Sequence, residues 1–196
     1  MIKTIKHLFL TLGITVFFSG CSIWGLSFNL NFWGDDEETK KELVIPENSP
    51  VWLKDISKKS FFSSLGVANR LEKDSPEFQN KRALINASNN ILKNIYQKSY
   101  LIFKEYEEEF DIQTSYNKDL KNLSQDIALK SLKKAKRTNF FISKDKTLFL
   151  EITLDEKIVL EYIQNGAKTL YKDNKNLNNF FFSEKGKENI IKKLKN

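Results

Sequence analysis

The stretch TNFFISKDKTLFLEITL, residues 138–154, decides the fold. It contains two apolar-rich runs, separated by the polar residues Ser143-Lys144-Asp145-Lys146. Two such runs joined by a short polar turn are typical of a β-hairpin. Asp155 follows directly and can cap a helix. The apolar residues of that helix recur at helical spacing: Ile158, Val159, Tyr162, Ile163 and Ala167.

A long helix is expected upstream of the hairpin, over residues 75–110. Ser75 offers an N-cap oxygen, Pro76 suits the first helical position, and Glu77 lies favourably at the positive end of the helix dipole. One face then carries residues at steps of three and four: Leu84, Ser88, Ile91, Ile95, Ser99, Ile102, Tyr106 and Phe110. This stripe is typical of a packed helix, and the helix would be about 50 Å long, enough to extend beyond a small sheet.

Two further elements complete the predicted domain. Residues 60–70, SFFSSLGVANR, are expected to form the first core strand, in which Gly66 marks either a bulge or a close approach of two backbones. A second helix is expected over residues 118–137, where basic last turns suit the negative end of its dipole. The order β-α-α-β-β-α predicts an α+β fold, with a small, mostly antiparallel sheet and helices packed on one face.

The tail, residues 171–196, departs from this pattern. It contains an Asn-rich loop, the cluster Phe180-Phe181-Phe182 and a short basic helix from about Ser183. A triple aromatic after a polar loop most often docks on a core, and we favour that interpretation. The alternative is an exposed apolar patch suited to a partner.

The N-terminus combines a basic start, an apolar run and Cys21, the only cysteine of the chain. The run over residues 8–18 is too short to cross a bilayer, which takes about 20 helical residues, but it fits a secretory signal. Phe18-Ser19-Gly20-Cys21 resembles the bacterial lipobox, in which cleavage between Gly20 and Cys21 follows acylation of the cysteine. We favour this interpretation over a buried thiol or an uncleaved anchor, since two or more acyl chains hold a protein stably on a membrane.

The chain between Cys21 and the domain has two parts. Residues 22–34, SIWGLSFNLNFWG, alternate apolar and polar positions, as a strand does. They would equally suit a membrane-proximal segment, with Trp24 and Trp33 at the headgroup level. Residues 35–42, DDEETKKE, are expected to form a solvated tether. The sequence thus divides into a signal peptide (1–20), a lipidated segment with a tether (21–48), a folded domain (49–170) and the tail (171–196).

The composition excludes several classes of active site. The only histidine, His7, lies in the predicted signal, so the mature chain would lack the imidazole of a catalytic triad or a zinc site. Neither a glycine-rich phosphate loop nor a calcium-loop motif occurs in the sequence. We therefore expect no enzyme activity, no metal and no cofactor. The net charge is +7, but the lysines follow no nucleic-acid-binding motif, so we expect no nucleic-acid partner.

Motifs of the central region resemble the LPP-twenty family of outer-membrane lipoproteins. In that family a Pro-x-Trp segment opens the domain, Gly-x-Ala lies in the first strand, and a strand-Leu-Asp-helix unit closes it. The matching positions here are Pro50 and Trp52, Gly66 and Ala68, and Leu154 and Asp155. The resemblance covers about residues 49–164 and implies an outer-membrane lipoprotein without catalytic activity. Some members of the family are envelope or flagellar-motor scaffolds, and Ser22 is compatible with outer-membrane sorting.

Two functions remain open. In the favoured one, the anchored domain is a structural protein that forms a homo-oligomer or docks on an envelope or flagellar assembly. Its candidate interaction surface consists of Ile95, Ile102, Tyr106, Phe180, Phe181 and Phe182. The alternative is a binding module for a small apolar or glycan ligand, with Trp52 and Tyr162 as candidate wall residues.

Overall fold

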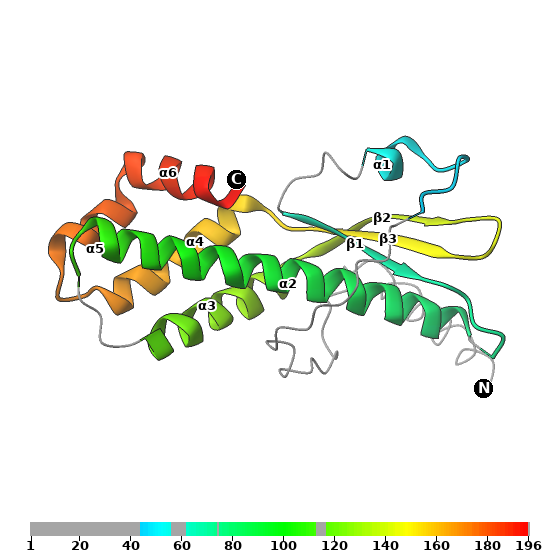
Figure 1. Ribbon diagram of the computed structural model, residues 1–196, viewed down its shortest axis with the longest axis horizontal. Helices are drawn as coiled ribbons and strands as arrows, with labels where there is room; N and C mark the ends of the chain where they lie inside the picture. The colour runs from blue at the N-terminus through cyan, green and yellow to red at the C-terminus, as the bar shows by residue number, and fades with distance from the viewer. Residues whose placement is uncertain (1–43, 56–61, 74, 113–116, 196) are drawn as a thin grey trace, which may run out of the picture.

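The computed structural model describes residues 44–55, 62–73, 75–112 and 117–195. In chain order the elements are α1 (Val51–Lys54), β1 (Ser63–Ala68), α2 (Pro76–Glu109), α3 (Asn117–Leu132), β2 (Lys136–Ile142), β3 (Leu148–Thr153), α4 (Glu156–Leu170), α5 (Lys175–Phe182) and α6 (Glu184–Lys195). The protein is α+β, with a three-stranded antiparallel sheet in the order β1-β3-β2 (Figure 1). The predicted fold class is confirmed, whereas the predicted signal peptide and Cys21 lie outside the described residues.

The hairpin of β2 and β3 forms as predicted. The Ser143 N–H donates to the Thr147 carbonyl at 2.9 Å, and the Lys146 N–H donates to the Ser143 carbonyl at 2.9 Å. Lys146 has a φ of 65°, the left-handed conformation that a three-residue hairpin loop needs at its last position. The Ser143 and Thr147 hydroxyls also bind the Asp145 carboxylate and lower its pKa. The turn is therefore held by its own side chains.

Helix α2 runs the length of the described fold (Figure 1). The Ser75 hydroxyl oxygen accepts the Phe78 N–H at 3.3 Å, and Pro76 takes the first helical position, as predicted. The helix packs on β1 and β3 at one end and on α3, α4 and α6 at the other. Because α2 has 34 residues, it extends well beyond the sheet, but α3, α4 and α6 cover one face of the extension.

The contact between α2 and β1 depends on a glycine. A Cβ atom on Gly66 would lie 1.7 Å from the Ala83 carbonyl oxygen and 2.9 Å from the Ala87 nitrogen. The register of β1 with β3 runs without a break from Ser63 to Ala68. Of the two interpretations of Gly66, a close approach of backbones is therefore confirmed, and a bulge is not present.

The second predicted helix is shorter than expected. Helix α3 ends at Leu132, and Lys136 and Arg137 already belong to β2. The sequence favoured a helix through Arg137 because its basic residues suit the negative end of a helix dipole. Pairing of Lys136 with Thr153 of the central strand overrides that local preference.

The predicted Asn-rich loop of the tail is instead helix α5. Asn174 caps this helix, since its side-chain oxygen accepts the Leu177 N–H at 3.0 Å. Leu177 and Phe181, four residues apart, are both buried in the main core. The asparagines therefore occupy the cap and the outer face of a helix whose inner face is apolar.

The aromatic tail docks on the core, as favoured. The Phe181 ring centroid lies 5.6 Å from that of Phe103, 5.3 Å from Tyr106 and 5.8 Å from Tyr171. Helix α6 then adds Lys193, whose ammonium pairs with Glu105 and lies 5.3 Å from the centre of the Tyr106 ring. The tail is thus part of the same core as the sheet and the long helix.

Four buried serines on α2 and α3 give a first testable prediction. They are Ser88, Ser99, Ser124 and Ser131, and their hydroxyls have no hydrogen-bond partner among the described residues. Replacing any one of them with alanine should raise the free energy of unfolding by up to about 1 kcal/mol, because alanine removes a desolvated hydroxyl and favours the helix. Urea unfolding measures the change.

Ser75→Ala is the control for this series. The Ser75 hydroxyl oxygen does have a partner, the Phe78 N–H, so its removal should cost about 1 kcal/mol. If the four buried variants lose stability in the same way, their hydroxyls are satisfied and the prediction is wrong.

Candidate interaction surface

Most of the predicted interaction surface lies in the core. Ile95, Ile102 and Tyr106 are at most 2% exposed, because the helices that surround α2 cover this face. Phe181 is fully buried and Phe180 partly buried, whereas Phe182 keeps 39% of its surface exposed. The prediction is therefore wrong for the buried residues, since the chain itself fills the space that a partner was expected to occupy, and for the exposed Phe182 it stays a prediction.

Two tyrosines in this core have raised pKa values. Burial raises the pKa of Tyr106 to about 12, and the negative charges of Glu109 and Glu105 add to the effect. Burial also raises the pKa of Tyr171, whose hydroxyl donates to the buried Glu107 carboxylate at 2.9 Å. Both phenols are neutral at physiological pH, and their role is in packing.

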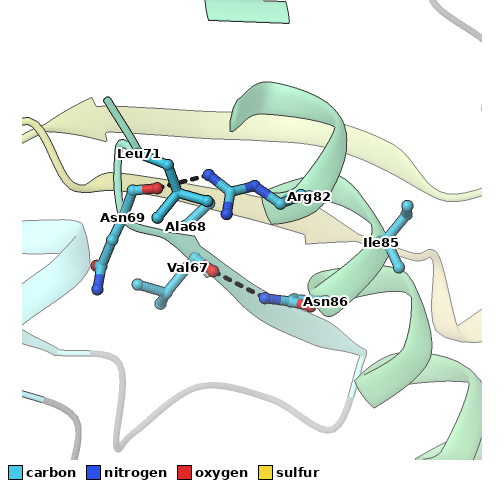
Figure 2. A pocket seen from close by; sticks show the side chains of 7 residues that line it. All are labelled: Val67, Ala68, Asn69, Leu71, Arg82, Ile85 and Asn86. Carbon is cyan, nitrogen blue, oxygen red and sulfur yellow. Dashed lines mark hydrogen bonds between the residues drawn. The ribbon is translucent and has the colours of Figure 1, made fainter. Parts of the chain in front are cut away.

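A depression of about 310 Å³ lies between β1 and the start of α2 (Figure 2). Its lining consists of Val67, Ala68, Asn69, Leu71, Arg82, Ile85 and Asn86. Trp52 and Tyr162, the predicted wall residues, lie on α1 and α4 and do not border it. The polar side chains of the depression hold the fold: Arg82 Nη2 donates to the Asn69 carbonyl at 2.6 Å, and Asn86 Nδ2 donates to the Val67 carbonyl at 2.8 Å.

These bonds belong to a ladder that seals the outer edge of β1. Arg82, Asn86 and Asn90 follow one another at steps of four along α2. They donate to the carbonyls of Asn69, Val67 and Leu65, which follow at steps of two. Four helical residues rise about 6.0 Å and two strand residues about 6.6 Å, so the two spacings match. The three side chains occupy the space beside these carbonyls, so an incoming strand would have to displace them to pair there.

The opposite edge of the sheet, β2, is open. The Ser143 N–H points inward to β3, so in an antiparallel ladder the backbone groups of Phe140 and Ile142 point outward. Those outward groups make no hydrogen bond within the part of the chain that the structure describes. We call the outer side of β2, with Phe140 and Ile142, the open edge.

The open edge also presents apolar side chains. Phe140 is 65% exposed and Ile142 is 55% exposed, although their register partners Leu150 and Leu148 are buried. The reason is the position of α2, which packs on β1 and β3 but leaves β2 uncovered. Exposed apolar side chains beside unpaired backbone groups are typical of a protein-binding surface.

The rest of β2 is held to β3 by side-chain contacts as well as by backbone pairing. On the other face of the sheet, Asn139 Nδ2 donates to Glu151 Oε2 at 2.6 Å, and the Phe141 ring lies 6.1 Å from the Phe149 ring. A register shift between Arg137 and Asn139 interrupts the regular ladder, and Lys136 and Arg137 pair with β3 beyond it. The regular stretch that carries the open edge is therefore short and limited to residues 139–142.

Basic residues border the open edge at both ends. Lys136 and Arg137 precede it, and Lys144 and Lys146 follow it in the turn. All four side chains are exposed, and none forms an ion pair within residues 44–195 as far as the structure describes them. The surface thus combines an apolar centre with positively charged ends.

Sequence reasoning predicted the strand β2 but missed its open edge. The available signal was the run Phe140-Phe141-Ile142, because a strand covered on one face alternates apolar and polar residues. A run of three apolar residues places at least one of them on each face. Which edge of the sheet this strand forms depends on the strand order, which local sequence does not encode.

The described residues contain no group of three histidine, cysteine, aspartate or glutamate side chains placed to hold a metal ion. Nor does any helix among them have the length and apolar character needed to cross a membrane. No family model and no curated protein matches the chain, so the resemblance to the LPP-twenty family stays a prediction.

Proposed function

We propose that the protein is a lipid-anchored structural protein of the outer membrane that binds an envelope partner through its open edge. The anchor would be Cys21, at the cleavage site that the lipobox resemblance implies. The observation that carries the binding role is the contrast between the two sheet edges. Helix α2 seals β1 with three side-chain hydrogen bonds, whereas β2 exposes Phe140, Ile142 and their backbone groups.

Strand addition is the mode of binding that this edge supports. An extended partner segment would gain main-chain hydrogen bonds from β2 and side-chain contacts from its apolar residues. Burying the exposed parts of Phe140 and Ile142 would contribute on the order of 3 kcal/mol, and each backbone hydrogen bond about 1 kcal/mol. Because association costs at least about 4 kcal/mol, the contact is weak in solution. Confinement to a membrane raises the effective concentration and makes such a contact useful.

The LPP-twenty resemblance narrows the class of partner. It would make the partner a protein of the envelope or of the flagellar motor, and it implies no chemical reaction. The alternative of a ligand-binding module has less support, because the polar groups around the depression are already bound to β1.

The test is made in the bacterium that produces the protein. We expect the double variant Phe140→Thr/Ile142→Thr to reproduce the envelope or motility defect of a deletion strain, with the protein still folded and abundant. Threonine keeps the strand preference and removes the apolar contact. The control is Phe78→Thr, since Phe78 is also 65% exposed but lies on α2, on the side of Arg82 and away from β2.

Two outcomes would contradict the proposal. A deletion strain with normal envelope integrity and normal motility would show that the protein has no structural role in the envelope. If the double variant restores normal behaviour to the deletion strain as fully as the Phe78→Thr control does, the open edge is not the binding surface.

A further inference from the structure

We infer that residues 26–32 of the same chain cover the open edge as an added strand, which the partner must displace. The inference deepens the proposed function and rests on it for the existence of that partner. Its basis is the match between the open edge and a segment that lies outside the described residues. The match has three parts, which are backbone geometry, apolar pattern and charge.

The backbone of the open edge can accept one short strand. Phe140 and Ile142 each present an N–H and a carbonyl outward, and the register shift before Asn139 prevents further regular pairing on that side. An exposed edge of this kind is an aggregation hazard, which proteins normally cover or block. Side chains of α2 already block the β1 edge of this protein. With a strand on β2, neither edge of the sheet would be open to another protein.

The apolar pattern of residues 26–32 fits the side chains of the open edge. Successive strand residues point to opposite faces, so the apolar side chains of this segment would all lie on one face. They are Leu26, Phe28, Leu30 and Phe32, with Ser27, Asn29 and Asn31 between them. Placed beside β2, the apolar face would bury Phe140 and Ile142, which lie on the α2 side of the sheet.

The charges of the two surfaces are opposite. The acidic run Asp35-Asp36-Glu37-Glu38 begins three residues after Phe32, and basic pairs stand at both ends of the open edge. An antiparallel strand would carry the acidic run towards Lys136 and Arg137, and a parallel strand would carry it towards Lys144 and Lys146. The pairing is favourable in either direction, because none of these four cations has an ion-pair partner in the described part of the chain.

The connection to the domain favours the same chain over a second copy. Eleven residues, 33–43, separate the segment from the first described residue, and they can span up to about 36 Å. A short tether gives the attached segment an effective concentration in the millimolar range, above that of a free second copy. Four residues, 22–25, separate Cys21 from Leu26, so docking would hold the open edge within about 17 Å of the anchor.

Hydrogen exchange measured by mass spectrometry tests the inference on the chain from Ser22 to Asn196. The buried apolar residues of the described structure run from Leu53 to Leu194, so this chain keeps the whole core. We expect amides of residues 26–32 to exchange at least about tenfold more slowly than in the Phe140→Thr/Ile142→Thr variant. The Phe78→Thr control should exchange like the unchanged chain, and the protection should not depend on protein concentration.

Each other outcome overturns the inference. Protection that rises with protein concentration would assign the strand to a second copy. Fast exchange in all three proteins, or protection that survives the double variant, would leave the open edge uncovered. The sample contains neither lipid nor partner. Any of these outcomes would therefore leave the proposed binding of a partner untouched, and a negative result in the bacterium would not change the hydrogen-exchange result.

Discussion

Replacing Gly66 with alanine is expected to lower the free energy of unfolding by about 3 kcal/mol or more. The new methyl group would lie 1.7 Å from the Ala83 carbonyl oxygen and 2.7 Å from its carbonyl carbon. Overpacking in a core costs about 1 to 3 kcal/mol when side chains can move aside. Here the obstacle is helix backbone, so α2 must separate from β1 as a whole. Urea unfolding of the purified chain measures the loss.

Gly166→Ala is the matched control, because it makes the same substitution at another buried glycine. A Cβ atom there would lie 2.9 Å from Leu123 Cδ1, the mobile end of a side chain. Alanine also favours helix α4 by up to about 1 kcal/mol, so the net change should be within about 1 kcal/mol of zero. A Gly66→Ala protein as stable as Gly166→Ala would show that β1 and α2 are not in backbone contact.

Replacing Phe181 with alanine is expected to cost about 3 to 5 kcal/mol, the usual loss for a fully buried phenylalanine. Its ring lies among those of Phe103, Tyr106 and Tyr171, within 5.8 Å between centroids. The cavity would open where α2, α4 and α5 meet, so the tail and the long helix should loosen together. Thermal and urea unfolding should both show the loss.

The neighbouring residue supplies the control for this prediction. Phe182 has the same side chain and keeps 39% of its surface exposed. Phe182→Ala should therefore cost clearly less, about 1 kcal/mol. Equal losses at the two positions would mean that the aromatic cluster does not dock as the structure shows.

The elements that the sequence predicted well are those with local signals. Ser75 and Pro76 mark the start of α2, and the Ser143–Lys146 turn marks the hairpin, since each depends on residues next to it in the chain. Gly66 indicated a bulge or a close approach, and only the position of α2 decides between the two. The start of α5, which the sequence predicted to be a loop, shows the limit of such signals. Asn174 caps a helix there, yet a run of asparagines equally suits a loop, and only the burial of Leu177 and Phe181 decides between the two.

The location of the interaction surface could not be predicted in the same way. The apolar stripe through Ile95 and Tyr106 shows that one face of α2 is buried, but periodicity is the same whether the cover is α3 and α6 or a second protein. Likewise, the spacing of four residues from Arg82 to Asn90 does not predict hydrogen bonds to a strand edge unless the position of β1 beside α2 is known. The open edge follows from the strand order β1-β3-β2, which is a property of the whole fold.

The proposed function depends above all on Cys21, because confinement to a membrane would be needed to make a weak contact at the open edge effective. The most direct measurement is the intact mass of the protein extracted from envelopes of the bacterium that produces it. We predict a chain that begins at Cys21, lacks residues 1–20 and carries two or more acyl chains, and a Cys21→Ala variant that carries none. A chain that keeps residues 1–20, or that begins at Cys21 with an unmodified thiol, would contradict the account.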